Sequence, residues 1–105
     1  MISRAVALMV VLATAHHCDA GTVADAEVLA IVSKHCVVCH GAKPAHESFR
    51  EAPKNIILED LADLKKHAAT IYAQTVQTRA MPLGNQTGMS EDDRATLGQW
   101  LKELP

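Results

Sequence analysis

Aromatic side chains are nearly absent from this chain of 105 residues, which contains only Phe49, Tyr72 and Trp100. A chain of this length forms one domain, and so small a domain buries a low fraction of its surface. Such domains often depend on a metal, a disulfide or a cofactor for stability. A large apolar prosthetic group would supply the bulk that so few aromatic side chains cannot.

Strong charge of one sign is also missing. The formal net charge is −2 at pH 7, and the sequence contains no basic run. Proteins that bind nucleic acids concentrate Lys and Arg on one face or in one segment. The composition therefore argues against nucleic acid as a partner.

The chain has no apolar run long enough for a comfortable membrane span, which needs about 20 residues. Residues 5–15 (AVALMVVLATA) are uncharged and mostly apolar, and one positive charge precedes them. This pattern is typical of the core of a secretory signal peptide, with a buried N-terminal helix as the alternative. Small residues predict cleavage after Ala15 or, as we favour, after Ala20. We therefore expect residues 1–20 to be a signal peptide and residues 21–105 to form an exported, periplasmic domain.

Three cysteines are present, and one stands apart from the other two. Cleavage at the favoured site removes Cys18. If it were retained at the mature N-terminus, Cys18 would be a lipid-attachment site, but His17 stands where a small residue is needed. We therefore do not expect a lipoprotein. Cys36 and Cys39 remain, separated by two valines and followed directly by His40.

This Cys-x-x-Cys-His motif is compatible with three chemistries. A structural zinc site needs four ligands, usually from two close pairs, and would have to recruit His46 or His67. A thioredoxin-like redox site expects a strand and a βαβ unit, and no convincing strand is found. A c-type haem uses every residue of the motif, because Cys36 and Cys39 bond the two vinyl groups and His40 reaches the iron. We therefore expect one covalently bound haem c.

The second axial ligand of the haem iron should come from a downstream segment. Met1 and Met9 leave with the signal peptide, so Met81 and Met89 remain. Because Pro82 disfavours helix in the residue before it, Met81 is expected in an extended loop just beyond a helix. We expect Met81 to be the ligand, which raises the reduction potential and leaves no open position on the iron.

Other roles for these side chains stay open at this point. Met81 as a flexible core filler is the plain alternative. Met89 or His67 could bind the iron instead, although we expect Met89 to pack the loop and His67 to line a helix flank. His46 follows the motif closely and is expected in a loop or on the surface.

Apolar residues at helical spacing predict three helices, over about residues 25–39, over about 59–79 and from Ser90 onward. Residues 41–57 contain two prolines and are expected to form a loop with a short turn. No internal repeat, second domain or low-complexity linker is found.

Local signals predict the ends of these helices. Asp25 or Thr22 can cap the first helix, and Ser90 with Asp93 resembles a capping box. Trp100 is expected in the core, packed against the first helix.

A first helix that ends in Cys-x-x-Cys-His, a methionine loop and a final helix that crosses the first resemble the all-α class I cytochrome c fold. The stretches "HCVVCHGAKP" and "APKNIILEDLADLKKHAATIYAQTVQTRAMPLGNQTGMSEDDRATLGQWL" are similar to the C-terminal cytochrome c domain of bacterial membrane-bound urate oxidases (urate hydroxylases). The resemblance implies that Cys36 and Cys39 carry the haem and that His40 and Met81 are its axial ligands. Asn55 stands where glycine is expected in that family, and asparagine tolerates the same left-handed backbone.

In that family an integral-membrane part precedes the cytochrome, and here a signal-like segment takes its place. The resemblance therefore implies a haem domain and does not extend to urate. We expect a monomeric electron-transfer protein, not an enzyme, that carries single electrons between redox proteins such as a membrane-bound oxidoreductase or a terminal oxidase. The alternative is a cytochrome subunit that works only within a membrane oxidoreductase complex, urate-oxidase-like in type. An open haem iron that reduces peroxide is a further rival, which no distal acid–base pair supports.

Overall fold

The computed structural model describes Val10 and residues 22–105, and this part of the chain contains helices and no strand. The all-α expectation is confirmed for these residues. The predicted signal peptide over residues 1–20, both cleavage sites and Cys18 lie outside them, apart from Val10. The α-helices are α1 (Asp25–His35), α2 (Val37–His40), α3 (Leu61–Lys66), α4 (Ala68–Tyr72) and α5 (Glu91–Glu103). Within residues 22–105, no helix has both the length and the apolar character that crossing a membrane requires.

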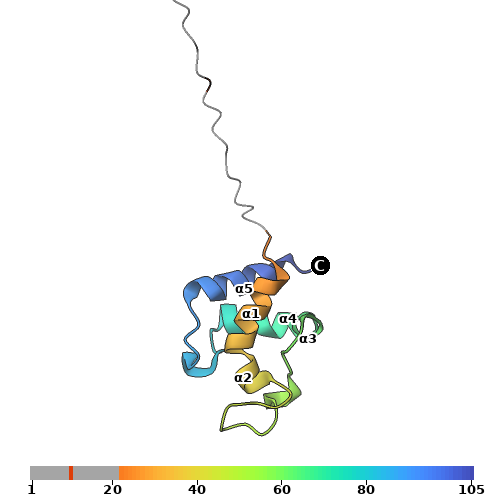
Figure 1. Ribbon diagram of the computed structural model, residues 1–105, viewed down its shortest axis with the longest axis vertical. Helices are drawn as coiled ribbons and strands as arrows, with labels where there is room; N and C mark the ends of the chain where they lie inside the picture. The colour runs from red at the N-terminus through yellow and green to blue at the C-terminus, as the bar shows by residue number, and fades with distance from the viewer. Residues whose placement is uncertain (1–9, 11–21) are drawn as a thin grey trace, which may run out of the picture.

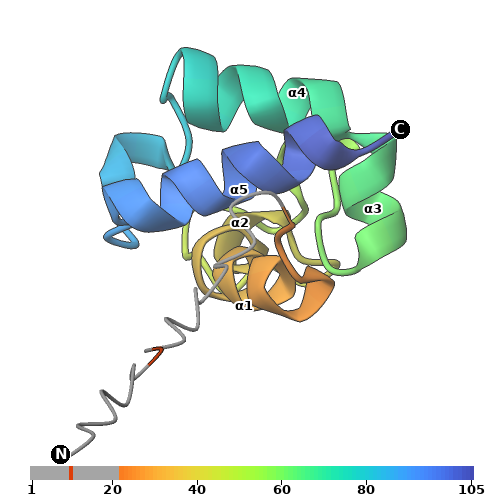
Figure 2. The ribbon, with the colours of Figure 1, turned by 90° about the horizontal axis from the view of Figure 1, so that it is seen from above.

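Helix α5 packs against both α1 and α4 and lies between them in the view of Figure 2, while Figure 1 shows it along the top of the helical domain. It begins where the sequence predicts, because the Ser90 hydroxyl accepts a hydrogen bond from the Asp93 backbone N–H at 3.0 Å. Its first turn is acidic, which complements the positive end of the helix dipole. Near its other end, Glu103 accepts a hydrogen bond from the Val23 backbone N–H at 3.1 Å. The beginning of α1 and the end of α5 therefore lie together.

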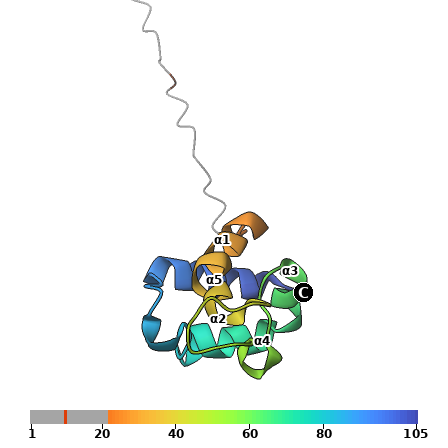
Figure 3. The same ribbon diagram turned by 60° about the horizontal axis from the view of Figure 1, so that its bottom comes forward.

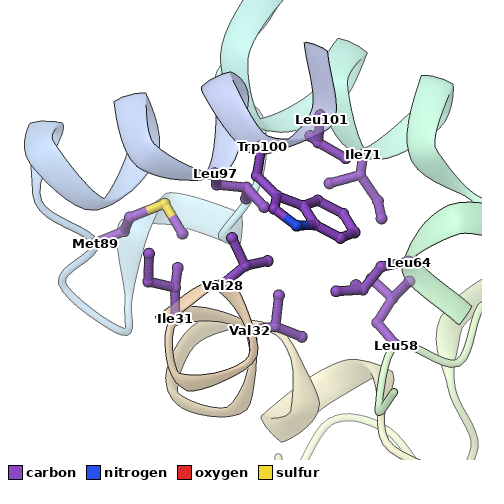
Figure 4. Close-up of a cluster of buried hydrophobic side chains, with 10 residues drawn as sticks. All are labelled: Val28, Ile31, Val32, Leu58, Leu64, Ile71, Met89, Leu97, Trp100 and Leu101. Carbon is purple, nitrogen blue, oxygen red and sulfur yellow. The ribbon is translucent and has the colours of Figure 1, made fainter. Parts of the chain in front are cut away.

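The core fills the space between α1, α5 and α4 (Figure 4). Trp100 is 3% exposed, and its indole N–H donates to Asp25 on α1 at 2.9 Å, which confirms its expected place. Each such side chain contributes about 1.5–3 kcal/mol relative to an exposed one. The buried apolar residues of this cluster are Val28, Ile31, Val32, Leu58, Leu64, Ile71, Met89, Leu97, Trp100 and Leu101.

The first predicted helix begins at Asp25 as expected, but its cap and its end differ from the prediction. Its N-cap is Ala24, which makes no side-chain capping bond, so the prediction of Asp25 or Thr22 as the cap was wrong. The helix also breaks at Cys36, whose φ of −112° departs from helical geometry, and α2 forms a separate turn. The Cys-x-x-Cys-His motif therefore forms a separate short helix, with Cys36 as its N-cap.

The second predicted helix, over residues 59–79, is also divided. His67, with φ −106° and ψ 16°, separates α3 from α4, although no proline or glycine marks the break. Helix α4 then widens into a π-helix over Ala73–Gln77. There the buried Thr75 hydroxyl donates to the Ile71 carbonyl at 2.7 Å, a bond to position i−4 that bends helices. The apolar stripe survives both breaks, because Leu64, Ile71 and Thr75 all stay buried.

The loop that follows α2 forms the lower end of the molecule in Figure 1 and comes forward in Figure 3. It contains a short 3₁₀ turn over Pro53–Asn55. Lys54 (φ 55°) and Asn55 (φ 57°) both adopt left-handed backbone geometry. The expectation that Asn55 tolerates this geometry is confirmed, and the turn brings the following residues back to α2.

Candidate haem site

A cavity of about 410 Å³ lies at the C-terminal end of α1 and brings the predicted site residues together. This volume is within the range of about 300–1,000 Å³ typical of sites for small molecules and cofactors. Cys36, Cys39, His40 and Met81 all line it. Its surface is mostly apolar, and the apolar residues that contribute include Val38, Ile56, Leu58, Ile71, Pro82 and Leu83.

Helix α2 fixes the two cysteines and the histidine within one helical turn. The Cys36 carbonyl accepts hydrogen bonds from the backbone N–H groups of Cys39 at 3.2 Å and of His40 at 2.7 Å. The chain then leaves the helix at Gly41, whose N–H bonds the Val37 carbonyl at 2.8 Å. A Cβ at Gly41 would stand 2.8 Å from that same carbonyl oxygen, closer than side chains approach. Glycine is therefore required where the chain turns away directly after His40.

The returning loop holds His40 at two points. The imidazole Nδ1 lies 2.7 Å from the Ile56 carbonyl oxygen, and the His40 carbonyl accepts from the Leu58 N–H at 2.7 Å. Because a carbonyl can only accept, Nδ1 carries the proton, and in the neutral ring Nε2 keeps its lone pair. This is the arrangement that orients a metal-binding histidine through its other nitrogen.

Met81 reaches the same cavity from a segment that the sequence places 41 positions after His40. It lies outside any helix, as the following proline predicts. Its backbone is held on both sides: its N–H donates to the Gln74 carbonyl at 2.9 Å, and its carbonyl accepts from Arg94 at 2.8 Å. The thioether is therefore carried by a fixed backbone.

Of the alternative ligands for the iron, Met89 lies in the core, whereas His67 lines the cavity. Met89 is 4% exposed and belongs to the apolar core, so the expectation that it packs is confirmed. His67, at the break between α3 and α4, lines the cavity, as does His46. His46 is half-buried, and its Nε2 lies 3.0 Å from the Gln86 side-chain oxygen. It thus joins the loop after α2 to the segment after Met81.

The buried His35 also lines the cavity and was not anticipated from the sequence. It is 3% exposed, its Nδ1 lies 2.7 Å from the Thr87 hydroxyl, and its Nε2 lies 3.5 Å from an Asp93 oxygen. These contacts join the end of α1 to the segment before α5. A signal was present, because Val28, Val32 and His35 occupy positions i, i+4 and i+7 of one helix face.

Arg94 on α5 is the second residue that sequence reasoning missed. It is 7% exposed and donates to two carbonyl oxygens, those of Thr75 at 2.6 Å and Met81 at 2.8 Å. Its position on the buried face with Leu97 and Leu101, at i+3 and i+7, was the signal that could have identified it.

The environment of the two thiols favours their neutral form. Burial raises the pKa of the Cys36 thiol from 9.0 to about 11, with the neighbouring Cys39 as a smaller cause. Burial also raises the pKa of Cys39. Thiol–disulfide oxidoreductases instead depend on a cysteine whose pKa is lowered. The thioredoxin-like interpretation therefore gains no support from these thiols.

The residues present fit a c-type haem. Two thiols share one helical turn, the adjacent imidazole keeps a lone pair on Nε2, and a thioether lines the same largely apolar cavity. In the described part of the chain, no group of three or more His, Cys, Asp or Glu side chains is placed to hold a metal ion. Comparisons with models of known protein families, with curated proteins and with solved structures found no match.

Proposed function

We propose that this chain is a monohaem c-type cytochrome of class I type that carries single electrons between redox proteins. The observation that supports it best is the single cavity that joins Cys36, Cys39 and His40 to the distant Met81. In this proposal Cys36 and Cys39 would hold the haem covalently, and His40 and Met81 would bind its iron. The signal-like segment supports export and a periplasmic location.

The haem, when bound, supplies an iron that changes between the ferrous and ferric states. The chain's own part is to hold the ligands still. The Ile56 carbonyl orients His40 through its Nδ1–H, and the backbone bonds of Met81 fix the direction of its thioether. The apolar side chains exclude water, and the thioether raises the reduction potential relative to histidine alone. Fixed ligands in an apolar cavity keep the rearrangement that accompanies electron transfer small.

The test is a set of visible spectra of the exported protein, oxidised and reduced, for the wild type and for Met81→Ala. We expect a low-spin c-type spectrum with a sulfur-to-iron charge-transfer band that the substitution abolishes. The ferrous wild type should bind carbon monoxide poorly at neutral pH, whereas Met81→Ala should bind it readily. A wild-type protein without covalently bound haem would refute the proposal.

The role of Met81 is tested separately from haem binding. If Met81→Ala leaves the c-type spectrum unchanged, the protein still binds haem, but His67 or Met89, and not Met81, is the second ligand. Ready binding of carbon monoxide by the wild type would instead favour an open iron and a peroxide- or gas-binding function.

A second candidate is a subunit that works only within a membrane oxidoreductase complex. The resemblance over about Ser33 to Leu101 to the cytochrome domain of membrane-bound urate oxidases favours it. Co-purification with an integral-membrane oxidoreductase from mildly solubilised membranes would support this candidate. A haem protein recovered alone and fully soluble, reducible by added electron carriers, would support the free carrier.

A further inference from the structure

Arg94 is a charged side chain in a nearly closed environment, with 7% of its surface exposed. Arginine is rarely buried, and removal of its charge from water is costly unless hydrogen bonds compensate. Arg79, in contrast, is exposed, lies outside any helix and pairs with Glu91, which is on α5 like Arg94. The hydrogen bonds described for Arg94 go to backbone carbonyls only, and its Nε has no partner within residues 22–105.

The two carbonyl oxygens that Arg94 binds belong to the segment that carries Met81. One nitrogen, Nη1, donates to the Thr75 oxygen at 2.6 Å and to the Met81 oxygen at 2.8 Å. Thr75 lies in the π-helix, at a point where the hydroxyl bond to Ile71 already distorts the helix. Arg94 therefore joins α5, the π-helix and Met81 through a single group. Bonds from a charged donor are stronger than those between neutral groups.

The Met81 carbonyl is one covalent bond from the Cα that carries the thioether. Anchors on both backbone groups that flank this Cα fix the direction in which the side chain leaves the backbone. The Met81 N–H is held by the Gln74 carbonyl, and Arg94 supplies the second anchor on the carbonyl side. We propose that Arg94 is the positioning residue for Met81, and that its hydrogen bonds keep the thioether directed at the haem iron. This inference rests on the proposed function.

The charge on this group does not depend on pH in the ordinary range. Burial, and to a lesser extent the nearby Arg79, lowers the pKa of Arg94. The guanidinium nevertheless stays protonated, because arginine starts from so high a value. A lysine in its place would carry one compact ammonium on a flexible stem and would lack the planar fork of donors. Replacement by lysine should therefore weaken the hold on the Met81 carbonyl.

The experiment compares haem-loaded wild type, Arg94→Met and Arg94→Lys, with Arg79→Met as the matched control. Arg79 is an arginine near the same loop, but it is exposed and bonds a side chain. The readouts are the sulfur-to-iron charge-transfer band, the reduction potential and the dissociation constant of imidazole from the ferric protein. Imidazole must displace Met81, so its affinity reports how firmly the thioether is held.

We expect Arg94→Met to bind imidazole about tenfold more tightly or better, because two buried carbonyls lose a charged donor. Its reduction potential should fall, and its charge-transfer band should weaken. Arg94→Lys should lie between Arg94→Met and the wild type in band strength and imidazole affinity, because a flexible ammonium replaces the fixed planar donor. Arg79→Met should stay within about twofold of the wild type in imidazole affinity.

Two results would overturn the role of Arg94. One is an Arg94→Met protein that is less stable to heat but matches Arg79→Met in band and imidazole affinity, because Arg94 would then only pack the core. The other, decisive if Arg94→Met does not fold, is a folded Arg94→Lys protein whose band and imidazole affinity match those of the wild type. A wild type whose haem shows no Met81-dependent band would instead refute Met81 ligation, and the role of Arg94 with it.

Discussion

Met81 and Met89 offer the sharpest test of the site, because the structure places their side chains in different surroundings. Met89 is 4% exposed in the apolar core, near Ile31 and Leu97, whereas Met81 lines the cavity (Figure 4). Met89→Ala removes three heavy atoms from the core and leaves the cavity untouched. We therefore expect it to destabilise the protein and to preserve the charge-transfer band.

The size of the loss follows from burial. Substitution of a buried methionine by alanine typically costs about 2–5 kcal/mol, with the larger values where neighbours cannot close the space. Met89 precedes the Ser90 cap of α5, and its backbone is bonded on both sides by the Asn85 side chain. These bonds survive the substitution, and the loop beside it can adjust, so we expect about 2–3 kcal/mol. For a domain of this size that corresponds to a fall in Tm of about 8–24 °C.

The assay is thermal unfolding of the ferric protein followed by circular dichroism, with the visible spectrum recorded on the same samples. Met89→Leu is the control, because a swap that conserves volume costs less than about 1.5 kcal/mol. Loss of the charge-transfer band in folded Met89→Ala would contradict the assignment of Met81 as the ligand. An unchanged Tm would show that Met89 is not a core residue.

Two further predictions concern the stability of the fold. Asp25→Ala should cost about 1–3 kcal/mol, because the buried indole N–H of Trp100 loses its partner, and chemical denaturation should show this loss in a wild-type background but not in Trp100→Phe. In the haem-free chain, the free energy of unfolding should fall as pH rises from about 9 through about 11. The unfolded state releases the Cys36 proton at 9.0 and the folded state only near 11, so the loss reaches at most about 2.7 kcal/mol. Denaturation across this pH range should show the fall in the unsubstituted chain and much less of it in Cys36→Ser; equal slopes would refute the burial of Cys36.

Features set by neighbouring residues could be predicted from the sequence. The start of α5 depends on a bond between Ser90 and Asp93, and the position of Met81 outside a helix depends on the proline that follows it. Asn55 was expected to accept left-handed geometry, and it does. In each case the cause lies within three residues of the effect.

Features that depend on distant partners could not be predicted. Arg94 and His35 occupy positions of the apolar stripes, which signal their burial, but their partners lie 13 to 58 residues away. The break at His67 leaves the buried stripe intact, so the periodicity is the same for one long helix and for two short ones. In the π-helix after α4, the Thr75 hydroxyl donates a hydrogen bond to the backbone carbonyl of Ile71, and the composition of the segment does not predict this bond.

The hydrogen bond between Val23 and Glu103 has a practical consequence for joining this domain to other proteins. It places the chain's entry into α1 beside the end of α5, while the cavity lies at the other end of α1, about 16 Å along the helix. A tether attached on the N-terminal side of Val23, whether a purification tag, a membrane anchor or a second carrier, therefore leaves from the end remote from the cavity. Such a fusion would hold the domain at a surface with its cavity side still open to a partner.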